Sequence, residues 1–63
     1  MSANERSILL QFKNGAQITS EEEYSILEKA SATGLVKFGM NMDGDNLVAE
    51  AKLTSRGKWF LKA

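Results

Sequence analysis

Two runs of alternating apolar and polar residues, separated by a turn, constrain this chain more than any other feature. The apolar side chains take every second position: Val36, Phe38, Met40 and Met42 in residues 35–42, then Leu47, Ala49, Ala51 and Leu53 in residues 47–54. Because successive side chains of a strand point to opposite faces, each run would present one apolar face. Residues 43–46, Asp-Gly-Asp-Asn, are typical of a turn between strands. The pattern therefore predicts an antiparallel β-hairpin that closes a small core.

The residues before the hairpin predict two short helices. In residues 4–13, three apolar side chains share one helical face: Ile8, Leu9 and Phe12. Ser2 or Asn4 is expected to cap this first helix. Asn14-Gly15 is expected to end it, since both residues tolerate the left-handed conformation found at helix C-termini.

The stretch Ser20-Glu21-Glu22-Glu23 marks the start of the second helix. Ser20 can accept a hydrogen bond from the Glu23 N–H, and Glu23 can reach back to the Ser20 N–H, which would make a capping box. Three carboxylates in the first turn also suit the helix dipole, so we favour capping over a metal-binding or partner-binding patch. The helix is expected to run to about Thr33, where Gly34 ends it. Residues 16–19 are expected to form a short extended connector.

The last residues of the chain are too apolar for a loose tail. Trp59, Phe60 and Leu61 predict one or two closing helical turns, although Gly57 disfavours a helix and leaves a strand as the alternative. The whole chain is therefore expected to be a single small α+β domain, residues 1–63. It would contain two short helices plus an antiparallel β-hairpin and an apolar C-terminal segment.

The composition excludes several classes of chemistry. The 63 residues include no cysteine and no histidine, which removes disulfides, thiolate nucleophiles and the usual zinc ligands. The turn at residues 43–46 lacks the distal glutamate of a calcium loop. Neither a paired acid and base nor a phosphate-binding glycine motif stands out. We therefore expect a non-enzymatic protein without a cofactor or a metal site.

The hydropathy pattern gives no sign of a membrane protein. The longest candidate run, Ile8-Leu9-Leu10, is far shorter than the roughly 18 apolar residues that indicate a membrane-spanning helix. The N-terminal residues do not resemble a secretory signal. These observations favour a cytoplasmic protein without a membrane partner.

Three segments, in order along the chain, carry a resemblance to a known family. Residues 27–36, Leu-Glu-Lys-Ala-Ser-Ala-Thr-Gly-Leu-Val, resemble a recognition helix that runs into a first wing strand, and residues 43–46 would be the wing tip. Leu53-Thr54-Ser55-Arg56-Gly57-Lys58 is similar to the ending that closes the wing. The chain thus resembles the winged helix-turn-helix superfamily, in particular the second half of MarR-like regulators. The resemblance implies a minimal winged-helix-like domain and a DNA-binding regulator of transcription.

The chain departs from this family in places that matter for DNA binding. Only residues 14–19 separate the two predicted helices, too few for the further helix of a full winged helix. The presumed recognition helix begins with three glutamates, whose carboxylates would repel DNA phosphates. Asp43 and Asp45 also make the wing tip acidic.

The charged residues balance overall but are divided unevenly along the chain. Eight basic and eight acidic residues give a net charge of zero, yet residues 35–63 carry five of the basic and three of the acidic ones. Four basic residues of this half form a candidate contact patch for nucleic acid or an acidic partner: Lys37, Lys52, Arg56 and Lys58. The alternative is a solvated sheet face without a partner.

The adjacent aromatics Trp59 and Phe60 are hard to bury together in so small a domain, so we expect one of them to lie at a protein interface. Packing of the pair into the core or a lid is the alternative. With the neutral charge and the acidic second helix, such an interface favours a small non-enzymatic protein-interaction module. A homodimer, or an accessory regulator of a phage or mobile element, fits the same features. The alternative function is a nucleic-acid-binding transcriptional regulator that uses the basic hairpin face.

Overall fold

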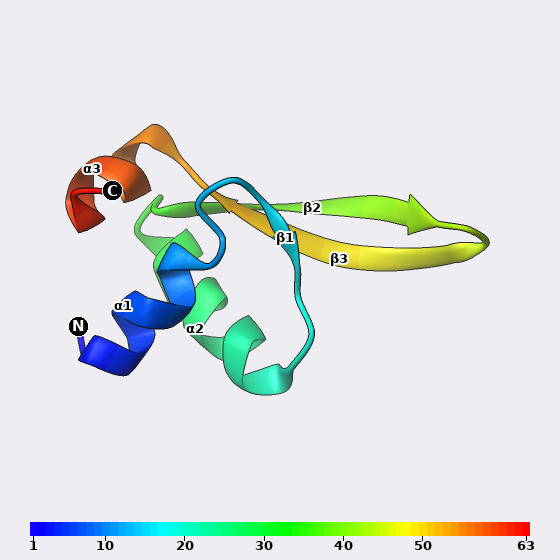
Figure 1. Cartoon of the computed structure of the whole chain (residues 1–63), viewed down its shortest axis with the longest axis horizontal. Coiled ribbons are helices and arrows are strands. Elements are labelled where there is room, and N and C mark those ends of the chain that lie inside the picture. The colour runs from blue at the N-terminus through cyan, green and yellow to red at the C-terminus, as the bar shows by residue number, and fades with distance from the viewer.

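The computed structural model describes residues 1–63 and contains three helices and a three-stranded antiparallel sheet (Figure 1). The elements follow in the order α1 (Ala3–Leu10), β1 (Ala16–Gln17), α2 (Glu21–Ala32), β2 (Val36–Asp43), β3 (Asn46–Leu53) and α3 (Ser55–Leu61). The α+β class predicted from the sequence is confirmed. No helix combines the length and the apolar character that crossing a bilayer requires.

The predicted hairpin is present, with each strand shifted by one residue from its predicted bounds. Strands β2 and β3 pair from Val36 opposite Leu53 to Asp43 opposite Asn46. The short strand β1 pairs with the other edge of β3, with Ala16 opposite Ala51, so the sheet order is β1-β3-β2. The extended segment predicted at residues 16–19 is thus a strand over Ala16–Gln17, and its pairing with β3 was not predicted. A two-residue strand is too short to show a periodicity of its own.

Helix α1 is shorter than the predicted range of residues 4–13, because the chain turns after Leu10. Ser2 is its N-cap, and the Ser2 hydroxyl accepts from the Glu5 N–H at 3.1 Å. Beyond the helix, the Phe12 carbonyl accepts from the N–H groups of Gly15 at 3.1 Å and Leu53 at 3.0 Å. The bond from Leu53 attaches the turn after α1 to strand β3.

Helix α2 begins as predicted, with one difference in its cap. The Ser20 hydroxyl accepts from the Glu23 N–H at 3.2 Å. The Glu23 carboxylate, however, accepts from the backbone N–H and the hydroxyl of Thr19, both at 2.9 Å, rather than from the Ser20 N–H. The carboxylate thus reaches one residue further back than in the predicted capping box. At the other end, Gly34 follows the helix with φ +78°, the left-handed conformation expected of it.

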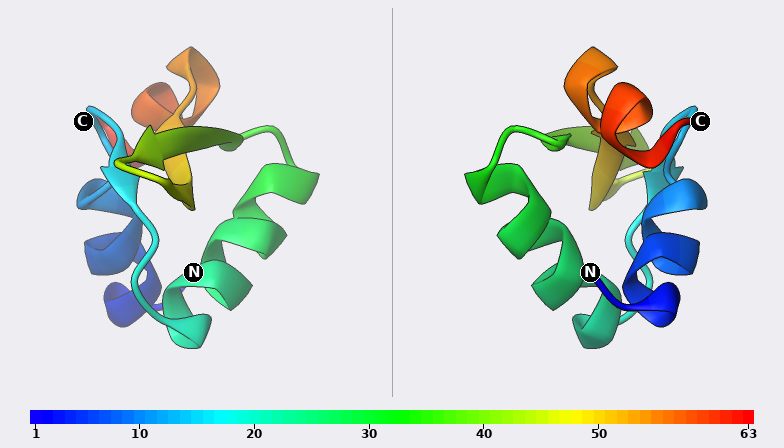
Figure 2. Two further views of the ribbon diagram at one scale, coloured as in Figure 1. Left: turned by 90° about the vertical axis from the view of Figure 1, so that its right-hand side faces the viewer. Right: turned by 90° about the vertical axis from the view of Figure 1, so that its left-hand side faces the viewer.

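The core lies between one face of the sheet and the helices. Helices α1 and α2 are on the same side of the sheet (Figure 2). Nine apolar residues are buried there: Leu9, Phe12, Leu27, Ala30, Leu35, Val36, Ala51, Leu53 and Leu61. The helices cover the sheet only where β2 begins and β3 ends, and the rest of the hairpin extends beyond them (Figure 1).

The C-terminal segment is a helix, which decides between the two predicted alternatives. Its N-cap is Thr54, whose hydroxyl accepts from the Gly57 N–H at 3.0 Å and donates to the Gly34 carbonyl at 2.6 Å. Gly57 is buried inside α3, where a Cβ would overlap the carbonyl of Leu35. The glycine that disfavours a helix in the sequence is therefore the residue that allows α3 to pack against the start of β2.

Candidate functional site

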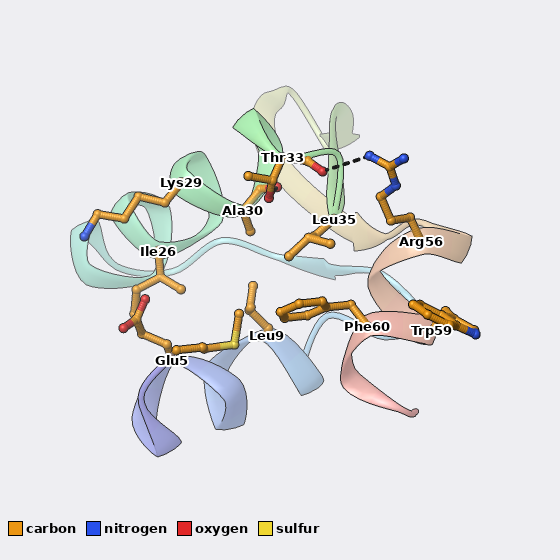
Figure 3. Close-up of a pocket in the computed structure, with 11 residues that line it drawn as sticks. Glu5, Leu9, Ile26, Lys29, Ala30, Thr33, Leu35, Arg56, Trp59 and Phe60 are labelled. Carbon is orange, nitrogen blue, oxygen red and sulfur yellow. Dashed lines mark hydrogen bonds between the residues drawn. The ribbon is translucent and has the colours of Figure 1, made fainter.

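An apolar groove lies where the three helices approach one another (Figure 3). Its volume is about 530 Å³, and side chains from α1, α2 and α3 line it, with Leu35 at its floor. Leu9, Ala30 and Leu35 are buried core residues, so the floor of the groove is the edge of the core itself.

Each helix contributes one wall of this groove, and two aromatic residues form the wall that belongs to α3. Figure 3 shows the Phe60 ring pointing into the groove toward Leu9, with Trp59 beside it at the outer end. The Trp59 side chain is 83% exposed and Phe60 is 52% exposed. The sequence predicted that one of this pair would lie at a surface, and the structure places both there, since Leu61 is the residue of this segment that enters the core.

The rim of the groove carries three charged side chains, Glu5, Lys29 and Arg56. The Glu5 carboxylate is already used, because it accepts from the hydroxyl of the Ser2 cap at 3.1 Å. The Arg56 guanidinium makes one long hydrogen bond, from Nη1 to the Thr33 carbonyl at 3.5 Å, which leaves most of its donors free. The groove therefore offers an apolar floor under a rim with two positive charges and one negative charge, and the negative one already has a hydrogen-bond partner.

The four predicted basic residues are not gathered in one place. Lys37 and Lys52 stand opposite each other across the hairpin and line a second hollow, of about 500 Å³, on the sheet face away from the core. Arg56 lines the groove between the helices, and Lys58 lines neither hollow. Lys37 and Lys52 thus lie side by side on the sheet, while Arg56 lines the same groove as Trp59 and Phe60.

The wall of the groove that α2 forms was not predicted from the sequence as part of a site. Ile26 and Lys29 of α2 and its C-cap Thr33 follow one another at spacings of three and four residues, which places them on one helical face. Ile26 lies one helical turn before the buried Ala30, at the edge of the apolar face of α2. Nothing in the sequence indicated that this edge faces α3 across a hollow.

The polar side chains of the groove hydrogen-bond to the backbone rather than to one another. The two hydrogen bonds that side chains donate among the lining residues, from Arg56 to Thr33 and from the Thr33 hydroxyl to Ala30, both end on backbone carbonyls. Nucleophilic catalysis needs one side chain in contact with another that activates it, and no such pair lines this groove. Glu22 and Glu23 serve structural contacts, with Asn4 and Thr19 respectively.

Comparisons with known protein families, with curated proteins and with solved structures find no match for this chain.

Proposed function

We propose that this protein is a small, non-enzymatic protein-interaction module that binds its partner in the groove between α1, α2 and α3. The observation that carries the proposal is the exposure of Trp59 beside Phe60 and Arg56 on one side of α3. Tryptophan and arginine are the residue types most enriched among those that dominate binding energy at interfaces. When a partner covers the exposed indole of Trp59, a large apolar area leaves water, and this burial favours binding.

The shape and charge of the groove favour a short amphipathic helix as the bound element. Helix-in-groove recognition uses apolar anchors spaced three or four residues apart, which enter a hydrophobic cleft. Lys29 and Arg56 at the rim would then pair with carboxylates beside those anchors. We therefore propose a partner segment with leucine or phenylalanine anchors and flanking aspartate or glutamate.

The single tryptophan of the chain makes this proposal directly measurable. We expect an amphipathic helical peptide with leucine anchors and glutamate flanks to shift the Trp59 emission to shorter wavelength as the indole is covered. A peptide with the same anchors and lysine flanks should bind at least tenfold more weakly. The double variant Lys29→Glu with Arg56→Glu should reverse this preference, because the rim then attracts lysine.

The control for the peptide titration is the pair Lys37→Glu with Lys52→Glu, which changes the same number of charges outside the groove. This variant should keep the preference for the acidic peptide. The proposal would be contradicted if neither peptide changed the emission spectrum. It would also be contradicted if the preference for the acidic peptide were lost in the Lys37 and Lys52 variant but kept in the Lys29 and Arg56 variant.

A second candidate function, binding of nucleic acid, takes up the winged-helix resemblance and the position of Lys37 opposite Lys52. Two cations side by side on an exposed sheet face can contact adjacent phosphates. If this function holds, a gel shift at low salt should weaken steeply as salt is raised, and Lys37→Ala with Lys52→Ala should abolish it. Lack of a shift with duplex and with single-stranded DNA and RNA at low salt would exclude it.

A further inference from the structure

Strand β2 is an open edge of the sheet. Strand β3 lies on one side of it, and no strand lies on the other. The Leu35 carbonyl accepts from the Thr54 N–H at 2.9 Å, which makes this pair a hydrogen-bonded position of the antiparallel ladder. Since such positions alternate, Lys37, Gly39 and Asn41 bond to β3, while the backbone groups of Phe38, Met40 and Met42 point to the open edge. An edge of this kind is a template for another strand.

The face of the hairpin next to this edge is apolar and uncovered. Met40, Met42 and Leu47 are each at least 60% exposed, and they lie on the same sheet face as the buried Val36 and Leu53. The helices stop short of this part of the hairpin (Figure 1). At the boundary, the Tyr24 ring packs on the Phe38 ring, with centroids 5.6 Å apart.

The sequence of β2 is complementary to itself. Two antiparallel copies of β2 centred on Met40 would place Met40 opposite Met40, and Phe38 of one copy opposite Met42 of the other. Lys37 and Asp43 are the two charged residues of the strand, and this register sets Lys37 of each copy opposite Asp43 of the second copy. Both residues lie on the polar face, while the apolar residues meet on the other face. Opposite charges and apolar pairs are the cross-strand combinations that stabilise sheets.

We propose that the protein forms a symmetric homodimer in which the β2 edges of two copies pair, centred on Met40, to make one continuous six-stranded sheet. The N–H of Met42 points outward and donates to the Asn41 side-chain oxygen at 2.9 Å. In the dimer it would donate to a backbone carbonyl of the second copy instead. The exposed Met42 of each copy would then lie beside Tyr24 and Phe38 of the other. This surface is separate from the groove of the proposed function, and it does not depend on it.

The mass in solution tests the dimer, and charge reversal tests its register. Light scattering with size-exclusion chromatography should give twice the 6.9 kDa of the chain at high concentration. Met40→Lys should give the mass of one chain, because it places two lysines on the symmetry axis. Lys37→Asp alone and Asp43→Lys alone should each weaken the dimer about tenfold or more, since each makes like charges face across the edge.

The decisive measurement mixes the two single variants. A copy with Lys37→Asp and a copy with Asp43→Lys have complementary edges in this register, so the mixture should regain the dimer mass although each alone is mainly monomeric. A variant that merely misfolds would not be rescued by mixing. A wild-type chain that stays monomeric at its highest soluble concentration, or single variants that dimerise as well as the wild type, would overturn the proposal.

The groove provides the matched control. Trp59→Ala should leave the dimer unchanged, and Met40→Lys should leave peptide binding in the groove unchanged. If Trp59→Ala instead abolished the dimer while Met40→Lys preserved it, self-association would run through the groove and the β2 pairing would be wrong.

Discussion

Replacing Gly57 by alanine is expected to destabilise this protein by about 3 kcal/mol, the scale of severe overpacking. A glycine inside a helix normally costs about 0.5–1 kcal/mol relative to alanine, so the same change elsewhere would be stabilising. Here the added Cβ would lie 2.9 Å from the Leu35 carbonyl carbon and closer still to its oxygen. Both atoms belong to the backbone, so neither can move aside without shifting α3 away from β2.

Urea unfolding followed by circular dichroism measures this effect, with Gly39→Ala as the control. A Cβ on Gly39 would meet only the Glu50 side chain, at 3.8 Å, which is an ordinary van der Waals distance. We expect that variant to unfold within about 0.5 kcal/mol of the wild type. Equal stabilities for Gly57→Ala and Gly39→Ala would mean that the close packing of α3 on Leu35 is not a feature of the protein in solution.

Replacing Phe12 by alanine is expected to remove about 3–5 kcal/mol of stability, the range for deleting a buried aromatic side chain. Phe12 is 1% exposed, and its carbonyl accepts the bond that attaches the turn after α1 to β3. Small domains of this size have a total stability on the order of 5 kcal/mol. The Phe12→Ala chain should therefore keep only about 0–2 kcal/mol of stability, so its unfolding midpoint should move close to zero urea.

The same substitution at Phe60 is the matched control, because it removes the same atoms from a half-exposed position. Phe60→Ala should cost about 1 kcal/mol or less in unfolding, since much of the ring is already in water. It should nevertheless weaken peptide binding in the groove. Phe12→Ala would thus act mainly on stability and Phe60→Ala mainly on peptide binding. Similar unfolding curves for the two variants would contradict these roles.

The hairpin could be predicted from the sequence because alternation and turn composition are local signals. Residues 43–46 fix where the chain reverses, and the reversal fixes the pairing of the two strands on either side. The pairing of Ala16 with Ala51 has no such signal, since it joins segments far apart in sequence. It follows from where the turn after α1 is attached to β3, which only the folded chain determines.

Of the residues that line the candidate groove, those on α3 could be predicted from the sequence and those on α2 could not. Trp59 and Phe60 stood out because two adjacent aromatics exceed what a small core can bury. Lys29 and Ile26 on α2 carried no comparable signal, because a polar residue beside an apolar stripe is common on any helix. Gly57 was misjudged for a similar reason: helix propensity is a local average, while its packing against Leu35 is a tertiary contact.

The carbonyl of Leu35 has a consequence for how the protein opens. It accepts from the Thr54 N–H at 2.9 Å. The Thr54 hydroxyl shares its one proton between this carbonyl, at 3.1 Å, and the Gly34 carbonyl, at 2.6 Å. A helix of seven residues is too short to be stable alone, so α3 can persist only while these contacts hold. The last helix therefore belongs to the same cooperative unit as the α2–β2 junction, and its amides should exchange with solvent together with that junction rather than fray as a tail. Trp59 is thus presented from a fixed wall of the domain.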